Sequence, residues 1–350
     1  MWPWALPGAA PAADLLWRVR TRRHRVCAGA THAAATGIGP IEELLACTLC
    51  GESRVRPLFE IHRGRHHYHV VRCPACGLLY RNPGVRPERL GDLYAGRYGR
   101  FLEGKYKGKR KRRYRLVLDA YAPLFAHGEG RRLLDYGCGT GLFLDLAEKR
   151  GFEPFGVDLS ADAITRARAR ASGRNAHFGH PLDVPEIARG GFDVVCLWSV
   201  LAHLPRPVED LAMLRGLLAP DGVLVILTVN ANSLALRVQG ARWGAFTPNH
   251  LVFFAPASLT RALAGAGFGA VVMRPALPDP VEAGTSRLRP ALERRLRRTT
   301  QRGNRGNMLR AVAFADPAGP ARWGMAADAV PLGPARPAVA PGRPSARSAS

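Results

Sequence analysis

The sequence lacks an apolar run long enough to cross a membrane. A spanning helix needs roughly 18 or more apolar residues, whereas the longest candidate, Val223 to Val229, has only the length of a strand. No secretory signal is expected, because Pro3 and Pro7 interrupt the apolar start and its basic residues follow that stretch instead of preceding it. Internal repeats are also missing, which disfavours a repeat array. We therefore expect a cytoplasmic protein built from globular domains.

Acidic residues are scarce. The chain has 27 Asp and Glu against 51 Lys and Arg, a formal net charge of +24. Such an excess favours a polyanionic partner, but most of it is arginine spread over ends rich in Ala, Pro and Gly, a pattern that a biased genome also produces. Nucleic acid is therefore the less favoured partner. The ends themselves, residues 1–43 and 316–350, lack sustained periodicity and are predicted to be disordered.

Four of the seven cysteines form two Cys-x-x-Cys pairs separated by 22 residues: Cys47, Cys50, Cys73 and Cys76. In a cytosolic chain such pairs favour metal over disulfides. Four thiolates complete the closed tetrahedral set of structural zinc, and a glycine after each pair relieves the tight turn. A redox or metal-free pair is the alternative. Four histidines lie between the two pairs: His62, His66, His67 and His69. We interpret them as solvated residues of strands and loops, and the alternative is that they tune a metal site.

The remaining pattern divides the chain into a zinc-ribbon-like module at 44–84, a helical connector at 85–127 and an α/β domain at 128–315. The connector's basic run, Lys105 to Arg115, is interpreted as a solvated helix face, with an RNA or anionic-substrate contact as the alternative. Short apolar runs alternate with amphipathic helices in the α/β domain, which predicts a mostly parallel, Rossmann-like sheet covered on both faces. The predicted strands are 133–136, 153–157, 192–197, 223–229, 270–274 and 308–314.

The first of these strands leads into a glycine-rich turn that opens a helix. Gly137 and Gly139 allow the backbone to approach a nucleotide closely, and Gly141 allows the helix to pack on the strand. Asp158 ends the second strand 21 positions after Gly137, where a carboxylate can accept both ribose hydroxyls. The spacing is G-x-G-x-G and not the dinucleotide G-x-G-x-x-G. Asp135 would also disfavour a pyrophosphate but suits the ammonium of S-adenosylmethionine (SAM), which we predict as the cofactor.

Together with the Leu217 to Gly222 turn before a buried strand, these residues resemble class I SAM-dependent methyltransferases, in the group that includes small-molecule and sugar methyltransferases. The resemblance implies cofactor contacts from Asp135, Gly137, Gly139, Gly141, Asp158 and Leu159. Many relatives carry an acid after the third strand to bind the adenine amine. Here His180 follows Gly179, and Asp183 is the substitute. The cysteine pairs and the phrase Cys76 to Pro83 resemble the zinc-binding front end of certain bacterial methyltransferases.

Two histidines are candidates for the acceptor side. Methyl transfer is an in-line displacement, so positioning and removal of the acceptor's proton supply the catalysis. His203 follows the predicted strand 192–197 and is the first candidate for general base. Relatives often have Glu-His where this chain has Ala202-His203, and a packing or helix-cap histidine is the alternative. His250, beside Asn249, lies in an aromatic segment that in the resembled group covers the acceptor. His250 either contacts the substrate or packs in the core of the segment that covers it.

We therefore expect a methyltransferase acting on a small molecule, a sugar or natural-product intermediate, at oxygen or carbon. The Asn/Asp-Pro-Pro-aromatic motif of amino-group methyltransferases is missing after the predicted strand 192–197, which disfavours nitrogen as the acceptor. An anionic sugar nucleotide is one candidate substrate. Two alternatives remain open: an rRNA or tRNA methyltransferase, and a catalytically degenerate protein that binds SAM on this fold.

Overall fold

The computed structural model describes residues 42–43, 45–63, 66–86, 89–90, 107–126, 128–276 and 305–332. The disorder predicted for the two ends falls largely outside these ranges. None of the helices within them is both long and apolar enough to span a membrane.

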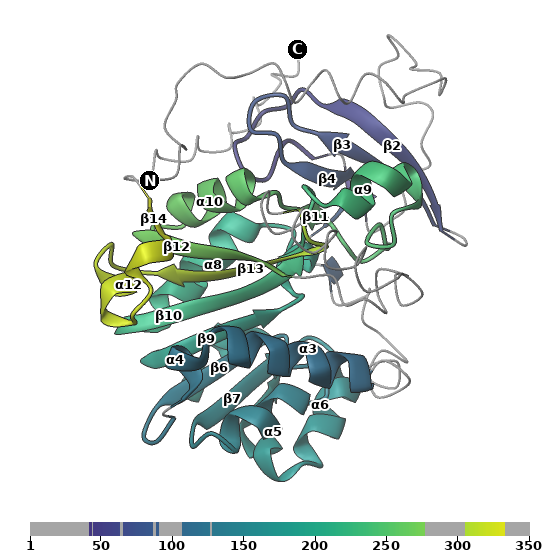
Figure 1. The fold of residues 1–350 in the computed structure, drawn as a ribbon. Coiled ribbons are helices and arrows are strands. Elements are labelled where there is room, and N and C mark those ends of the chain that lie inside the picture. The colour runs from purple at the N-terminus through teal and green to yellow at the C-terminus, as the bar shows by residue number, and fades with distance from the viewer. Residues whose placement is uncertain are drawn as a thin grey trace, which may run out of the picture. The chain divides into compact units, whose positions relative to one another are not determined.

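An eight-stranded sheet forms the centre of the fold, in the order β14-β12-β13-β10-β9-β6-β7-β8. Neighbouring strands from β8 to β10 run parallel, whereas β13 is antiparallel to both β10 and β12 (Figure 1). The predicted Rossmann-like, mostly parallel sheet is confirmed, including both late strands. The strands are β6 (Arg132–Tyr136), β7 (Glu153–Asp158), β8 (Ala176–Phe178), β9 (Phe192–Trp198), β10 (Leu218–Val229), β12 (Ala270–Ala276), β13 (Met308–Phe314) and β14 (Ala329–Pro331).

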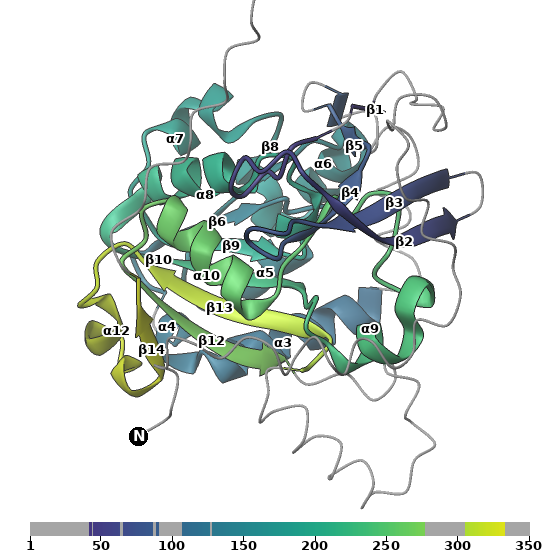
Figure 2. The same cartoon turned by 90° about the horizontal axis from the view of Figure 1, so that it is seen from above.

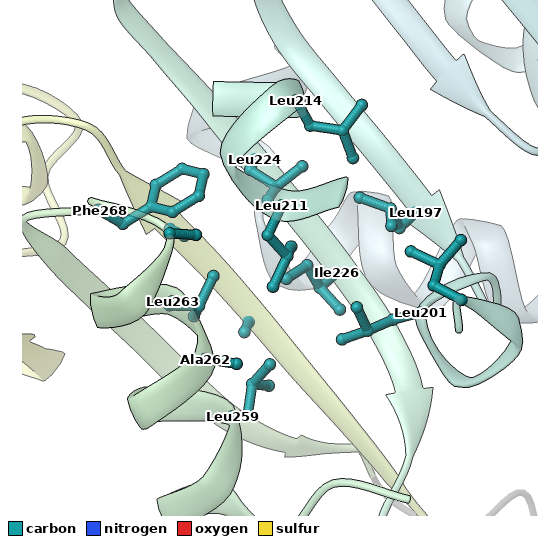
Figure 3. Close-up of a cluster of buried hydrophobic side chains, with 14 of the residues drawn as sticks. Leu197, Leu201, Leu211, Leu214, Leu224, Ile226, Leu259, Ala262, Leu263 and Phe268 are labelled. Atoms are coloured by element: carbon teal, nitrogen blue, oxygen red, sulfur yellow. The ribbon is translucent and has the colours of Figure 1, made fainter. Parts of the chain in front are cut away.

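Helices cover both faces of this sheet (Figure 2). The larger ones are α3 (Lys107–Ala120), α5 (Leu142–Glu148), α6 (Ala161–Arg168), α8 (Pro207–Gly216) and α10 (Pro256–Gly265). Because side chains alternate along a strand, Val194 and Cys196 of β9 pack with α3 and α5, whereas Val195 and Leu197 pack with α8 and α10. Figure 3 shows the second of these layers, where leucines of α8 and α10 meet Leu197 and two residues of β10. Burial on both faces thus explains why residues 194–198 of β9 are all apolar.

The cysteine-bearing segment forms a second sheet in the order β11-β4-β3-β2. Its strands are β2 (Arg56–Arg63), β3 (His66–Arg72), β4 (Leu79–Asn82) and β11 (Val252–Phe253), and the short pair β1 (Glu42–Glu43) and β5 (Gly84–Val85) lies beside them in the chain. β11 comes from the α/β part of the sequence, and Cys47, Cys73 and Tyr80 belong to the same apolar core as β9 and β10. The boundary predicted at residue 84 therefore does not separate two cores.

The folded part also extends further than the sequence pattern indicated. Disorder was predicted from residue 316, but α12 (Gly319–Arg322) and the turn η6 (Ala326–Asp328) lead into β14, which pairs with β12. Met325 is buried in the core under α3, so this extension covers apolar surface that the sheet edge would otherwise expose. The prediction failed because the segment's few apolar residues are spaced irregularly.

The remaining elements are short and connect the larger ones. They are α4 (Ala122–Phe125), η2 (Ala171–Asn175), η3 (Pro181–Asp183), α7 (Pro185–Ala188), η4 (Leu201–His203), α9 (Leu234–Gln239) and η5 (Gly240–Arg242). α3 and α4 confirm the helical part of the predicted connector. Residues 91–106 of that connector are outside the described ranges.

Candidate functional site

The carboxyl ends of the parallel strands β6, β7, β8 and β9 lie along one edge of the central sheet, and most of the predicted site residues are found there. This edge is the usual ligand position in doubly wound folds. Asp135 is the next-to-last residue of β6, and its side chain is almost completely buried. Its Oδ1 atom has no hydrogen-bond partner among the described residues. A buried carboxylate oxygen without a partner is costly and indicates an absent cation or donor.

The glycine turn that follows β6 has a backbone conformation that favours glycine at three positions. Gly137, Gly139 and Gly141 all have positive φ, which residues with a Cβ rarely adopt. A Cβ at Gly137 would lie 2.5 Å from the side chain of Val200, and one at Gly141 would lie 3.1 Å from Ala167 of α6. The turn therefore packs closely on the loop after β9 and on a neighbouring helix, as well as opening α5.

Asp158 holds this turn in place. Its Oδ2 accepts a hydrogen bond from the Gly139 amide at 2.8 Å, and its Oδ1 accepts one from the Ser160 amide at 2.9 Å. Burial raises the pKa of Asp158, and these two amide donors act in the opposite direction. Each oxygen still has a second lone pair, so the carboxylate can shape the glycine turn and accept ribose hydroxyls at the same time.

Leu159 and Asp183, the two remaining predicted cofactor contacts, lie beyond the ends of β7 and β8. Leu159 is 37 % exposed although it is a large apolar side chain that follows a buried strand. Asp183 is exposed and ends the turn η3. The His180 side chain accepts a hydrogen bond from the Leu182 amide, so it acts as a cap of η3. Leu182 is itself 50 % exposed, which leaves apolar surface on this side of the edge.

Arg110 belongs to this edge, although the sequence analysis did not single it out. Its guanidinium donates to the Tyr114 hydroxyl at 3.0 Å, and its positive charge lowers the pKa values of both Asp135 and Asp158. Desolvation is nevertheless the largest effect on Asp135 and raises its pKa to about 8. The only sequence signal for Arg110 was the basic run, in which nothing distinguishes it from its neighbours.

The two candidate histidines of the acceptor side lie next to each other, although 46 residues separate them in the chain. The ring centroids of His203 and His250 are 4.7 Å apart in a T-shaped arrangement. The Nδ1 atom of His250 lies 2.6 Å from the Ala245 carbonyl oxygen, which can only accept. Nδ1 therefore carries the proton, and Nε2 of His250 keeps a lone pair.

Both rings are neutral near pH 7. Burial lowers the pKa of His203 to about 3, with a further contribution from His250, while backbone groups of Asn249 and Ser199 partly offset this. Burial also lowers the pKa of His250. A neutral imidazole can accept a proton, but a pKa this low makes His203 a weak base.

Comparisons with known proteins agree with this site. Residues 106–272 match the family model described as "Methyltransferase domain". A ubiquinone biosynthesis O-methyltransferase of Psychrobacter arcticus is 31 % identical over 152 residues, which are 40 % of this chain and 59 % of the relative. The corresponding protein of Alkalilimnicola ehrlichii is 33 % identical over 134 residues, 37 % of this chain and 54 % of the relative. The chain thus spans little more than half the length of these curated relatives.

Among solved structures, a SAM-dependent methyltransferase from Archaeoglobus fulgidus is 23 % identical with a TM-score of 0.47, and the match covers 62 % of this chain and 99 % of that one. The family match includes the glycine turn, both buried acids and His203. Residues 106–272 of the chain are thus similar to a methyltransferase domain.

Arg81 joins the cysteine-bearing segment to the part of the α/β domain that holds His250. Its side chain is buried over the Tyr68 ring, and it donates to the Pro248 carbonyl at 2.5 Å and to the Pro83 carbonyl at 3.2 Å. Its backbone amide donates to the Leu251 carbonyl at 2.8 Å. The residues on either side of His250 are thus held from the cysteine-bearing segment, which the sequence did not indicate.

Ser199 is a third residue, after Arg110 and Arg81, that the sequence did not indicate. It directly follows β9 and has a φ of 61°, in the left-handed region that residues other than glycine rarely adopt. Its amide donates to the Leu227 carbonyl at 2.7 Å. Strained backbone of this kind is concentrated at functional sites, and here it turns the chain from the sheet toward His203.

The four predicted metal-ligating cysteines of the segment converge. The Sγ atoms of Cys47 and Cys76 are 3.4 Å apart, those of Cys50 and Cys73 are 3.5 Å apart, and all four lie within 4.8 Å of one another. Tetrahedral Zn–S bonds of about 2.3 Å place sulfur atoms about 3.8 Å apart. The Cys76 amide also points at Cys73 Sγ, 3.4 Å away, and Gly51 and Gly77 both have positive φ. This geometry fits a tetrahedrally coordinated metal ion.

Substituting His203 should change how stability depends on pH. The pKa of His203 is held at about 3 in the folded chain, against about 6.5 when unfolded. As pH falls below about 6.5, the unfolded chain gains a proton that the folded chain refuses, so the wild type loses up to about 1.4 kcal/mol per pH unit. Denaturant unfolding at several pH values between about 7 and 5 should show a shallower loss for His203→Gln. His66→Gln, which replaces an exposed histidine, is the control and should behave as the wild type does. If the stability of His203→Gln falls with pH in parallel with that of the wild type, the burial of His203 is contradicted.

Proposed function

We propose that this chain is a SAM-dependent methyltransferase that methylates a hydroxyl group of a small molecule. The observation that carries the proposal is the buried Oδ1 of Asp135, which has no partner among the described residues and lies directly before the glycine turn. An ammonium group is the partner that such a carboxylate requires. Transfer to oxygen is supported by the relatives, which are named O-methyltransferases.

Each proposed cofactor contact has a physical basis in the residues present. When bound, SAM supplies an electrophilic methyl group on a positively charged sulfur. Asp135 accepts from the ammonium of the methionine part, and Asp158 accepts from the ribose hydroxyls. Leu159 offers apolar surface for adenine, and Asp183 is the candidate acceptor for its amine. Arg110, whose charge lowers the pKa values of both acids, would balance the negative charge of the methionine carboxylate.

The neutral histidine pair favours an acceptor whose hydroxyl is already acidic. A base with a pKa of about 3 takes a proton poorly from an aliphatic alcohol, but it can assist a phenol or an enol. We therefore place aromatic or enolic hydroxyls ahead of the sugar hydroxyls expected from sequence. A carbon acceptor activated as an enolate meets the same requirement. The acceptor is positioned by His203 and His250, with catalysis resting mainly on alignment with the sulfonium.

We also propose that the four cysteines bind one structural zinc ion. A closed set of four thiolates leaves no position for substrate, so the ion would stabilise the fold and perform no chemistry. Because β4 follows the second cysteine pair and hydrogen bonds with β11, the ion would act on the acceptor side through this strand pair.

Asp135→Asn should weaken SAM binding and remove its pH dependence. At pH 7 most of the unliganded chain holds a proton on Asp135, because burial raises its pKa to about 8. Binding an ammonium requires the carboxylate, so affinity should rise by roughly 25-fold between pH 6 and 7.5, with proton release. Calorimetric titration in two buffers of different ionisation enthalpy measures both the affinity for SAM and the number of protons released. The variant should lose about 10- to 100-fold in affinity at pH 7.5, the size of a lost charge-assisted hydrogen bond.

A variant of Arg110 supplies a second arm of this experiment. Arg110→Met should also weaken SAM binding, whereas Lys111→Met, an equal change of charge at an exposed position of the same helix, should not. If Asp135→Asn binds SAM as tightly as the wild type with the same proton release, the assignment of the ammonium to Asp135 is wrong.

Protein purified under reducing conditions should contain about one zinc ion per chain. Cys47→Ser should lose it, and the loss should increase amide hydrogen exchange in β4 and β11 more than in β6, because only the first two strands lie next to the cysteines. SAM affinity should change little. Cys27→Ser, outside both cysteine pairs, is the control. Metal-free wild-type protein, or equal loosening of β6, would contradict this prediction.

Methyl transfer from isotopically labelled SAM should be tested on matched phenolic, enolic and aliphatic hydroxyl acceptors. We expect turnover of the acidic hydroxyls, reduced about 10²- to 10⁴-fold in His203→Gln at unchanged SAM affinity. His250→Gln should raise KM more than it lowers kcat, because it removes binding from ground and transition states equally. Label transferred to RNA, or SAM binding without turnover of any acceptor, would overturn the proposed function in favour of one of the two alternatives.

A further inference from the structure

The hairpin formed by β2 and β3 gathers metal-ligating side chains on one face. In the strand register, His62 lies opposite His67 and Glu60 lies opposite His69. The side-chain alternation of each strand places these four residues on the outer face, whereas Ile61 and Tyr68 are buried on the inner face. Cross-strand partners on one face are separated by only about 5 Å. The topology thus brings four potential ligands together at a place that the SAM and cysteine sites do not use.

Three of these side chains already converge on a common point. Nε2 of His67 lies 2.8 Å from Oε1 of Glu60, and Nε2 of His62 lies 3.4 Å from the same oxygen. The rings of His62 and His67 are stacked, with centroids 4.4 Å apart and planes only 9° from parallel. A tetrahedral ion with bonds of 2.0–2.1 Å to nitrogen and oxygen separates its ligand atoms by about 3.3 Å. Small rotations of the three side chains therefore suffice to enclose an ion.

We propose that Glu60, His62 and His67 form a second metal site, which binds one divalent transition-metal ion such as Zn²⁺ or Ni²⁺. Imidazole suits these ions, whereas Ca²⁺ and Mg²⁺ prefer a shell of oxygen ligands. All three side chains are exposed, so water completes the coordination and the ion exchanges with solvent. His69, whose ring centroid is 5.6 Å from that of His67, is the nearest further ligand.

The position of the site gives it a structural consequence. The inner face of the same hairpin supports the segment after α9: Phe59 packs on Phe246 with ring centroids 5.5 Å apart, and Arg63 donates to the carbonyls of Arg242 and Trp243 at 3.2 and 3.1 Å. An ion that links β2 to β3 across the outer face would therefore stabilise the strand pair on which this segment rests.

The test is calorimetric titration of the full chain with Zn²⁺ and separately with Ni²⁺, after the cysteine site has been loaded with one equivalent of zinc. We expect one further equivalent to bind. His67→Gln and Glu60→Gln should each weaken this second event at least tenfold. His66→Gln is the matched control, because His66 is also exposed and on β3 but alternates to the opposite face.

A cysteine variant separates the two sites. Cys47→Ser should lose the first equivalent and keep the second, with circular dichroism confirming that the chain remains folded. The proposal is overturned if no second equivalent binds, or if His66→Gln weakens binding as much as His67→Gln. It is also overturned if Cys47→Ser abolishes both events while the hairpin stays folded, since the ion would then need the thiols.

Discussion

The two peptide groups of Leu251 connect the three parts on which the acceptor side depends. Its amide donates to the Ala202 carbonyl at 2.7 Å, in the loop after β9, and its carbonyl accepts from the Arg81 amide at 2.8 Å, in the cysteine-bearing segment. His203 and His250 are the chain neighbours of these bonded residues. The backbone bonds therefore bring the two rings to 4.7 Å, and no direct bond between the rings is needed. Any change that displaces β4 would move both histidines together.

The cofactor side is organised instead by buried negative charge. Burial raises the pKa of Asp135, and the charge of Asp158 on the adjacent strand raises it further, so Asp135 is largely neutral at pH 7 without a ligand. Two backbone amides that donate to Asp158 offset part of the desolvation cost of its carboxylate. Oδ1 of Asp135 has no donor among the described residues. A cationic ligand supplies what is missing. The site is therefore most complementary to a molecule whose positive charge arrives next to Asp135, and this explains why a pyrophosphate would be rejected.

Much of the fold could be predicted from sequence because its signals are local. β9 contains the continuous apolar run 194–198, and the glycines after β6 predicted a tight turn that opens a helix. The acids at strand ends followed from the parallel order, which places those ends at one edge.

The parts that the sequence did not indicate depend on pairing between distant segments. Val252 and Phe253 belong to a longer apolar run that resembles lid core, and only the three-dimensional structure shows them paired with Tyr80 and Leu79. Arg110 could not be selected from a run of equivalent basic residues, since its importance comes from the position of α3 beside two acids. Ser199 and Arg81 were also missed because their importance comes from the three-dimensional structure. A strained backbone angle and a buried guanidinium leave no pattern in composition or period.

The low basicity of the histidine pair limits how the two sides can cooperate. Protonating His203 would place a charge in a buried position next to a second imidazole, and the structure resists this, as its lowered pKa shows. In the proposed reaction the methyl group would leave the sulfonium, which becomes a neutral thioether, and the acceptor oxygen would lose its proton. Because His203 resists holding that proton, the proton would have to pass on to solvent. A weak, neutral base beside a strong electrophile suits an acceptor that is already acidic, and it makes alignment of the acceptor, set by the hydrogen bonds of Leu251, the main contribution of the protein.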